Sequence, residues 1–305
     1  MKISVQTGGI QEHIGVDACY RMIRNAGFDA VDVNLDHLLT PAEIRMKKQG
    51  EAFKGSDEEI LAYFRPWKEA AEKYGLENYQ AHAPFPSYIV DPTGEYNAYL
   101  MHVLEKTIMG CAYIGCRCLI IHPFFLGYSD QVDDATEWET NVARYAALIP
   151  AAKRYGVTIC LENMFKEHKG KIYAACCSDI DTACRYVDTL NEMAGEKVFG
   201  FCLDTGHLLL TSQEIKMAML QLGGRIEAFH VHDNNGCEDQ HLAPYMGRLD
   251  WKRFEEGLQE IGYAKTLSFE TFNVMNVVDR ELWPQALKFI EQAGRMFARR
   301  VENRT

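Results

Sequence analysis

TICLE, at residues 158–162, is a short apolar run that closes on a carboxylate, Glu162. It follows a segment of helical period and a glycine, Gly156, which is the usual order at the start of a buried strand. Other runs of this kind also end in a residue able to bind a metal ion. They are ENYQAH at His82, RCLIIH at His122, GFCLD at Asp204, EAFH at His230 and TLSFE at Glu270. The chain therefore places chemically active side chains at the ends of predicted strands.

These strand ends recur at a nearly constant interval. Successive positions lie about 40 residues apart, except for the shorter step from Asp204 to His230. Such an interval is the length of one strand-plus-helix unit. A parallel barrel gathers the C-terminal ends of its strands into one ring, where side chains distant in the sequence meet at one pocket. We therefore expect the six residues to converge.

Short apolar runs alternate with longer segments of helical period along the whole chain, which is typical of repeated βα units. The pattern predicts strands near residues 3–6, 30–35, 77–82, 117–122, 157–162, 198–204, 226–231 and 266–270. It predicts helices near residues 16–27, 57–74, 96–114, 136–153, 179–194, 212–222, 250–261 and 281–300. Residues 36–55 read as an irregular insertion, and residues 163–178 as a loop with little pattern.

Eight predicted strands and eight predicted helices favour an α/β fold, a (β/α)8 TIM barrel. No Pro-rich linker or break in composition divides the chain, so we expect residues 1–305 to form a single TIM-barrel domain. No GxGxxG or GxxxxGK[ST] motif follows a predicted strand, which leaves a dinucleotide or phosphate-loop site unsupported. The main alternative, a Rossmann-like open sheet, would require some of these strands to be absent.

The composition is that of a globular protein with an acidic surface. Hydrophobic residues make up 47% of the chain, and no apolar run is long enough to span a membrane. The formal net charge of −11 disfavours a nucleic-acid partner. The N-terminus runs straight into a predicted strand, without the zones of a secretory signal, and the cysteines are scattered. We therefore expect a cytoplasmic protein without disulfides.

Glu162, Asp204 and Glu270 together with His230 form a set of oxygen and nitrogen ligands. Such a set suits Mn²⁺, Mg²⁺, Co²⁺ or Zn²⁺. Three carboxylates in one pocket would repel each other strongly unless a cation held them. A single member of the set, such as Asp204, could instead cap a helix. If the barrel forms, the four residues predict a divalent metal site.

A second layer of polar residues is predicted around this set. His82 and His122 end the third and fourth strands, and His207 follows Asp204 in LDTGH. Asp239 and His241 lie in CEDQH after the seventh strand. We interpret His232 as a structural residue that faces away from His230.

The motifs HAPF, HP, LEN, LDTGH, HVHD, DQH and FET together resemble the xylose-isomerase-like TIM barrels. This superfamily includes the sugar phosphate isomerases and epimerases and is related to endonuclease IV. In its isomerase and epimerase branch, the resemblance implies one divalent metal held by Glu162, Asp204, His230 and Glu270. Glu162 and Glu270 would also act as acid and base.

The resemblance implies a reaction on a ketose or related polyol. One glutamate would remove a proton beside the carbonyl and the other would return it, through a metal-stabilised enediolate. His207 would hydrogen-bond the oxygen on which charge develops. His82, His122, His241 and Asp239 would fix the substrate hydroxyl groups. We expect a small sugar as the partner, neither nucleic acid nor membrane. The apolar faces of helices such as residues 287–297 are compatible with a homo-oligomer, although packing against the barrel is the more usual role of such a face.

Endonuclease IV is the first alternative, because its trinuclear zinc site would be matched at every ligand position. Those positions are His82, His122, Glu162, Asp204, His207, His230, Asp239, His241 and Glu270. Such an enzyme would cleave abasic DNA as a zinc phosphodiesterase. However, the loops at residues 84–96 and 123–139 are rich in aromatic residues, and the second is acidic. Loops of this kind are better suited to stack on a sugar ring than to grip phosphates.

Two further alternatives concern the reaction itself. In ketose 3-epimerases we would expect an arginine shortly after the strand-7 histidine, but HDNNGCED at residues 232–239 has none. An inosose or polyol dehydratase, which uses similar metal-assisted proton abstraction, is therefore a second alternative. A non-catalytic barrel that only binds sugar is the third, although a site that had lost its activity would be expected to lose at least one ligand.

Overall fold

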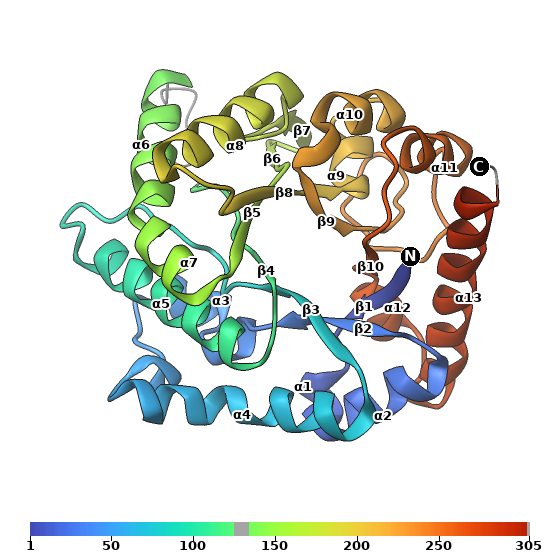
Figure 1. Ribbon diagram of the computed structural model, residues 1–305, viewed down its shortest axis with the longest axis horizontal. Coiled ribbons are helices and arrows are strands. Elements are labelled where there is room, and N and C mark those ends of the chain that lie inside the picture. The colour runs from blue at the N-terminus through green and yellow to red at the C-terminus, as the bar shows by residue number, and fades with distance from the viewer. Residues whose placement is uncertain (125–133, 304–305) are drawn as a thin grey trace.

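Parallel strands form a barrel surrounded by helices in the computed structural model, which describes residues 1–124 and 134–303 (Figure 1). Within those residues the barrel has eight strands, which confirms the predicted TIM barrel. They are β1 (Lys2–Gln6), β2 (Ala30–Asn34), β3 (Glu77–His82), β4 (Cys118–Ile120), β5 (Thr158–Glu162), β8 (Phe199–Asp204), β9 (Ile226–His230) and β10 (Thr266–Phe269). Each strand pairs with its neighbours in chain order, as βα units require.

The ring closes between its last two strands and its first. β10 pairs with β1 in parallel register, with Val5 opposite Phe269. Beyond the end of β9, Val231 forms a parallel bridge with Phe269, and its amide donates to the carbonyl of Ser268 at 2.8 Å. The seam therefore brings the C-terminal ends of β1, β9 and β10 to the same side of the barrel.

Helices of very different length cover the outside of the barrel (Figure 1). They are α1 (Gln11–Ile14), α2 (Val16–Ala26), α3 (Pro41–Arg45), α4 (Asp57–Tyr74), α5 (Glu95–Tyr113), α6 (Asp134–Ala147), α7 (Ile149–Tyr155), α8 (Ile180–Ala194), α9 (Thr205–Leu210), α10 (Ile215–Leu222), α11 (Trp251–Glu260), α12 (Phe272–Val277) and α13 (Trp283–Glu302). Short 3-10 turns lie at Asp36–Leu38, Glu51–Phe53, Gly223–Arg225 and Arg280–Leu282.

Local sequence signals set the ends of these helices. Ser56 and Glu59 form a reciprocal capping box at the start of α4, which satisfies two backbone amides that the helix leaves free. Gly75 ends α4 with φ at 63°, a conformation that glycine adopts without strain. The chain can then turn directly into β3, which carries His82 to the mouth of the barrel.

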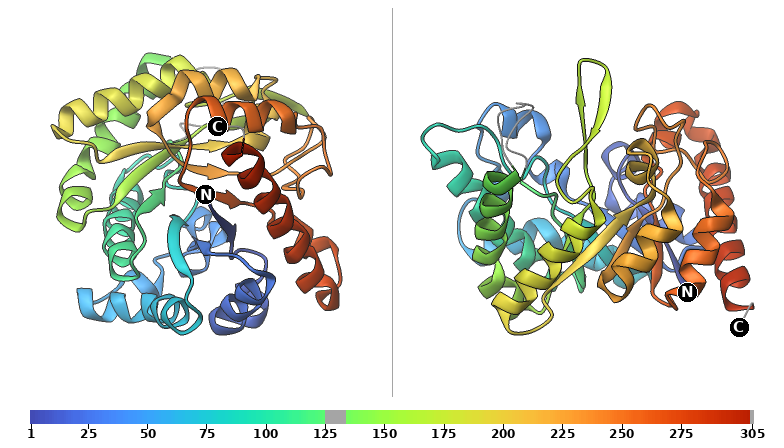
Figure 2. Two further views of the ribbon diagram at one scale, coloured as in Figure 1. Left: turned by 45° about the vertical axis from the view of Figure 1, so that its right-hand side comes forward. Right: turned by 90° about the horizontal axis from the view of Figure 1, so that it is seen from above.

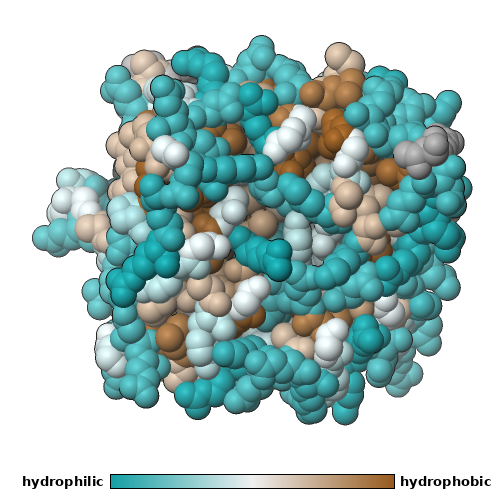
Figure 3. All heavy atoms as spheres, viewed as in Figure 1, coloured by the Kyte–Doolittle hydropathy of each residue, from teal (hydrophilic) through white to brown (hydrophobic). Residues whose placement is uncertain are grey.

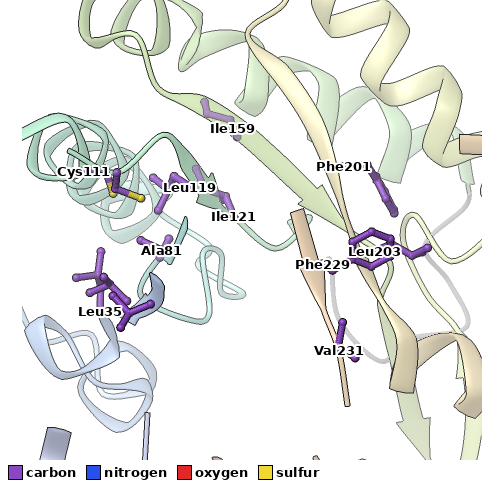
Figure 4. Close-up of a cluster of buried hydrophobic side chains, with 14 of the residues drawn as sticks. Leu35, Ala81, Cys111, Leu119, Ile121, Ile159, Phe201, Leu203, Phe229 and Val231 are labelled. Carbon is purple, nitrogen blue, oxygen red and sulfur yellow. The ribbon is translucent and has the colours of Figure 1, made fainter. Parts of the chain in front are cut away.

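Side chains of each strand alternate between two buried layers. Residues that point outward pack against the helices, as Leu119, Ile159 and Phe201 do in Figure 4. Inward positions carry smaller side chains, and Cys118, Cys160, Cys202, Ile120 and Ala228 form a separate cluster inside the ring. This alternation, with period two, is the pattern expected of barrel strands. The small inner layer leaves room for polar residues above it.

The structure corrects the sequence prediction in several segments. Residues 163–178, expected to be a loop, contain an antiparallel hairpin of β6 (Phe165–His168) and β7 (Lys171–Ala174). This hairpin projects well beyond the barrel (Figure 2, right). The helix predicted at 136–153 is divided into α6 and α7, with Pro150 early in the second. The short helices α9 and α12, which directly follow β8 and β10, were not predicted.

Hydrophilic side chains cover most of the face seen in Figure 3, and hydrophobic ones form scattered patches. Among the described helices, none is both long and apolar enough to cross a membrane. The cysteines form no disulfide bonds, and most are buried in the core. The buried cysteines pack as small hydrophobic side chains, as the sequence suggested, whereas Cys237 is exposed.

Candidate metal centre

The six predicted strand-end residues meet at the C-terminal mouth of the barrel. His82, Glu162, Asp204 and His230 are the last residues of their strands, and His122 and Glu270 follow theirs closely. Parallel strands in a ring place all these ends on one side, which is the physical reason that the prediction succeeds.

Glu162, Asp204, His230 and Glu270 offer ligand atoms that lie within 4.8 Å of one another. All four side chains are buried. His230 presents Nδ1 to Glu162 Oε1 at 3.0 Å and to Glu270 Oε2 at 3.4 Å. The predicted set of oxygen and nitrogen ligands is therefore brought together.

This group fits a divalent cation. It concentrates three buried carboxyl groups, which a cation would neutralise. Glu162 Oε2 is buried and forms no hydrogen bond of good geometry with the described residues, although His122 Nε2 lies 3.1 Å away. A buried carboxylate oxygen without a partner is unfavourable, and a metal ion would supply that partner.

Three further groups of metal-binding side chains adjoin the first among the described residues, and one of them consists of Glu162, Cys202 and His230. In another, His82 and His122 share Glu162 with the first group, and their Nε2 atoms lie 2.9 Å apart. The third contains His207, His232, Asp239 and His241. His122 Nδ1 and Asp239 Oδ1 are buried without a hydrogen-bond partner in the described structure. The four predicted metal ligands and the other five positions that match the endonuclease IV alternative thus lie in adjoining groups.

Three of these histidines are held in the same way. His82, His207 and His241 each place Nδ1 within 3.0 Å of a backbone carbonyl oxygen, which belongs to Ala83, Asn163 and Glu270 respectively. A carbonyl oxygen only accepts, so each Nδ1 carries the proton in the hydrogen bond. Their Nε2 atoms are therefore left to face other ligands, an arrangement common around metal sites.

His232 contradicts the prediction that it faces away from His230. Its Nε2 lies 2.9 Å from Asp204 Oδ2, and its ring stacks on His241 with centroids 4.1 Å apart. Residues i and i+2 of a strand point to the same side, so His230 and His232 both turn toward the mouth of the barrel. His232 is therefore part of the site.

Asp204 has two roles. Its Oδ1 accepts the backbone amide of His207 at 2.6 Å and so caps α9, while Oδ2 faces His232. One side chain can therefore cap the helix and also occupy the predicted ligand position. The cap also fixes where α9 begins, and with it the position of His207.

Burial and neighbouring charges shift the pKa values of Glu162 and Glu270 in opposite directions. Burial opposes ionisation of Glu162, but His230 and His122 outweigh it and hold the pKa of that carboxyl well below its usual range. Burial raises the pKa of Glu270 to about 7, against the opposing effect of His230 and His241. One carboxyl thus strongly favours its ionised form and the other readily keeps a proton, which is the division that acid and base roles require.

The neighbouring aspartates and His207 form a second charged set. Burial opposes the imidazolium form of His207, yet Asp204 and Asp239 raise the pKa of His207 well above its usual range. The pKa of Asp204 is lowered in spite of burial, because His207 and His232 lie beside it. A cationic His207 can donate a hydrogen bond from Nε2 as well as from Nδ1.

A cavity of about 500 Å³ opens above these groups. Its apolar lining comes from Phe85, Met164, Phe165 and Phe272, of which Met164 and Phe165 lie at the base of the hairpin. His82, His122, His207, Asp239 and His241 also line it. Residues 125–133 of the second aromatic loop lie outside the described residues. A cavity with aromatic walls and polar groups at its base is suited to a small polyhydroxy ligand.

The sequence prediction missed one wall of this cavity, formed by Gln6, Gly8, Asn34 and Asp36. Gln6 and Asn34 are the last residues of β1 and β2. The same strand-end signal that identified Glu162 applies to them. Amide side chains are poor metal ligands, so a prediction based on metal-binding residue types does not include them.

Parts of this chain are similar in sequence to other proteins. L-ribulose 3-epimerase of Mesorhizobium japonicum is 26% identical over 160 residues, which are 51% of this chain and 48% of that enzyme. The uncharacterised protein y4fM of Sinorhizobium fredii is 39% identical over 72 residues, which are 24% of this chain and 23% of y4fM. These matches therefore span half or less of the relatives' own length.

Solved structures share the fold over nearly the whole chain. A structure of L-ribulose 3-epimerase has a TM-score of 0.71 at 18% identity and covers 99% of this chain and 96% of its own. The IOLI protein, solved with a bound zinc atom, has a TM-score of 0.65 at 18% identity and covers 99% and 98%. A sequence model of the xylose isomerase-like TIM barrels matches residues 20–293. The chain belongs to the family of xylose isomerase-like TIM barrels.

Proposed function

We propose that this protein is a divalent-metal-dependent sugar isomerase or epimerase that acts on a ketose or related polyol. The observation that carries the proposal is the position of Glu162 and Glu270. They come from different strands, share one ligand group with Asp204 and His230, and line the same cavity of about 500 Å³. Two carboxyl groups on one small cavity can transfer a proton to and from a bound carbon atom.

Glu162, Asp204, His230 and Glu270 would hold one Mn²⁺, Co²⁺, Mg²⁺ or Zn²⁺ ion. When bound, the ion would supply Lewis-acid polarisation of the substrate carbonyl, which acidifies the adjacent C–H bond. The similar proteins support this class of substrate, since both L-ribulose 3-epimerase and D-psicose 3-epimerase match part of the sequence.

The chain's own residues would divide the remaining work. One glutamate removes the proton and the other returns it, either to the opposite face of the same carbon or to the neighbouring carbon. His207 would donate a hydrogen bond to the oxygen on which charge develops. His82, His122, His241 and Asp239 would bind hydroxyl groups, and the aromatic walls would pack on the sugar carbons.

The missing arginine after His230 keeps the dehydratase alternative open. Residues 232–239 follow the strand as HDNNGCED, and the next arginine is Arg248. A dehydratase would use the same proton abstraction and then expel a hydroxyl group. Product analysis of one reaction mixture distinguishes the two, because only the dehydratase changes the mass of the sugar.

A second candidate function is a zinc phosphodiesterase of the endonuclease IV kind. The specific observation in its favour is that the described residues form connected ligand groups containing all nine matching positions. The net charge of −11 and the acids lining the cavity oppose it, because a DNA backbone is a polyanion. A single sugar substrate is therefore the preferred proposal.

Metal analysis and a proton-exchange assay together test the two candidate functions. Protein purified without chelator is analysed for metal content, and ketoses are then incubated with it in D₂O. About one metal per chain with deuterium at the carbon beside the carbonyl is the expected result. Three zinc ions per chain, with cleavage of abasic DNA and no deuterium uptake, would reverse the order of the two candidates. A single domain, a cytoplasmic location and a homo-oligomer stay predictions.

A further inference from the structure

Gln6 makes a buried contact with Glu270. The Gln6 residue is 2% exposed, and its Nε2 donates to Glu270 Oε1 at 2.5 Å. β1 and β10 are paired with Val5 opposite Phe269, so Gln6 and Glu270 are the next residues along the two neighbouring strands. Strand register therefore places this amide beside the carboxylate.

The orientation of the Gln6 amide follows from this contact. In its ionised form, which is the form that would bind a metal ion, Glu270 only accepts hydrogen bonds, so the NH₂ end of the amide faces Glu270 and the oxygen faces elsewhere. That oxygen, Oε1, is buried and accepts no hydrogen bond from any described residue. An unpaired buried amide oxygen is destabilising. The amide therefore adopts this conformation because of the hydrogen bond from Nε2, and not because both of its polar atoms are paired.

The contact distinguishes the two oxygens of Glu270. Oε1 is held by Gln6, while Oε2 lies 3.4 Å from His230 Nδ1, inside the ligand group. Rotation of the carboxylate would break the hydrogen bond to Gln6. Hydrogen bonds of this kind, from an outer partner to a ligand, orient the ligand toward the metal position.

We propose that Gln6 is a positioning residue that fixes the orientation in which the Glu270 carboxylate presents one oxygen to the metal group. The inference rests on the proposed function, because it assigns Glu270 to that group. Gln6 itself stands outside the predicted ligand set, since its amide is committed to Glu270.

Gly8 offers a second way to disturb the same contact. A Cβ atom at position 8 would lie 2.8 Å from Gln6 Oε1 and 2.9 Å from Asn34 Nδ2. Both atoms are the ends of side chains and can move without a shift of the backbone. Gly8→Ala should therefore displace the Gln6 amide while leaving the chemistry of Glu270 and Gln6 unchanged.

Cobalt binding provides a test that does not depend on turnover. Chelator-stripped protein is titrated with Co²⁺ against a chromophoric chelator, and the visible d–d spectrum of the bound ion is recorded. We expect Gln6→Met to weaken Co²⁺ binding by about tenfold and to alter the spectrum. Gly8→Ala should act in the same direction with a smaller effect, and it carries the test if Gln6→Met does not fold.

Gln11→Met is the matched control. Gln11 is also a buried glutamine; its Nε2 donates to the carbonyl of Asn34 at 2.6 Å, and its Oε1 accepts the indole N–H of Trp67 at 3.0 Å. This variant should lose thermal stability but keep the Co²⁺ affinity and spectrum of the wild type.

The outcomes separate this inference from the proposed function. Unchanged Co²⁺ affinity and spectrum in both Gln6→Met and Gly8→Ala, with a loss of stability like that of Gln11→Met, would overturn the positioning role alone. Failure of the wild type to bind Co²⁺ would overturn the metal-dependent function and the inference with it. Weakened binding in Gln6→Met with wild-type binding in Gln11→Met supports both.

Discussion

Glu162 and His230 face each other at the mouth of the barrel, with Oε1 3.0 Å from Nδ1. The other side of the imidazole, Nε2, lies 3.2 Å from the buried carboxylate of Asp32. His230 is therefore placed between two acids, and its Nδ1 is directed into the ligand group. A substitution of Glu162 would therefore alter both its contact with His230 and the proposed proton transfer.

Glu162→Gln should lower the rate of proton exchange by about 10²–10⁴-fold, because the amide cannot accept the substrate proton. The rate is measured as deuterium uptake from D₂O into a ketose. Glu227→Gln is the control, since Glu227 lies on the same strand as His230 but three residues nearer the opposite end of the barrel. Equal activity in Glu162→Gln and wild type would exclude Glu162 as an acid or base.

The pKa of Glu270 leads to a pH-dependent difference in stability. Its folded-state pKa of about 7 is above the unfolded value of roughly 4.3. The folded metal-free protein therefore holds a proton that the unfolded chain releases, and its stability falls as the pH rises between those values. Glu270→Gln removes this effect. We expect the metal-free variant to be more stable than wild type at pH 8, by roughly 1–3 kcal/mol, with no such gain at pH 4.

Chemical denaturation of the metal-free proteins at both pH values measures this difference. Glu162→Gln is the contrasting variant, because the pKa of Glu162 is lowered and its ionised form is favoured in the folded state. Its loss should destabilise the protein at pH 8. Addition of Mn²⁺ should stabilise the wild type more than Glu270→Gln. A variant that is less stable than wild type at pH 8 without metal would contradict the role of burial at Glu270.

Asp233, the last residue of HVHD, should be a structural residue. It is buried and accepts backbone amides of Asn234, Gly247 and Leu249, each at 2.9 Å, as well as the indole of Trp251. These bonds anchor both ends of the loop that carries Asp239 and His241. Asp233→Ala should lower the free energy of unfolding by roughly 3 kcal/mol or more, since several hydrogen bonds to a charged group are lost.

Urea denaturation checks this loss. Asp250→Ala serves for comparison, because Asp250 accepts one amide, that of Arg253, at an exposed helix start. It should cost only about 1 kcal/mol. Similar losses in the two variants would show that Asp233 is not the main anchor of the loop.

Gly206→Ala should displace His232. A Cβ at this position would lie 2.0 Å from His232 Cε1, and the ring cannot retreat because His241 stacks on it at 4.1 Å. We expect a loss of roughly 1–3 kcal/mol from overpacking, together with weaker metal binding. Gly224→Ala is the matched control, since a Cβ there meets no described atom within 4 Å. Differential scanning calorimetry and Co²⁺ titration measure the two effects.

The sequence was sufficient to locate most of the centre, and the reason is geometric. His82, His122, Glu162, Asp204, His230 and Glu270 each close or closely follow a short apolar run, and a ring of parallel strands brings such ends together whatever lies between them. Neither the barrel nor the convergence depends on the details of side-chain packing. The apolar runs and their spacing therefore determined the fold and the principal ligand group.

Only the tertiary structure decided the contacts between strands that are distant in the chain. The pairing of Gln6 with Glu270 joins residues 264 positions apart and depends on closure of the ring between β1 and β10. The hairpin of β6 and β7 was missed because its side chains pack little of their surface in the core and show no clear alternation. Apolar periodicity records which face of an element is buried, whereas register, rotamer and hydrogen-bond partner are set by neighbours that the sequence alone does not specify.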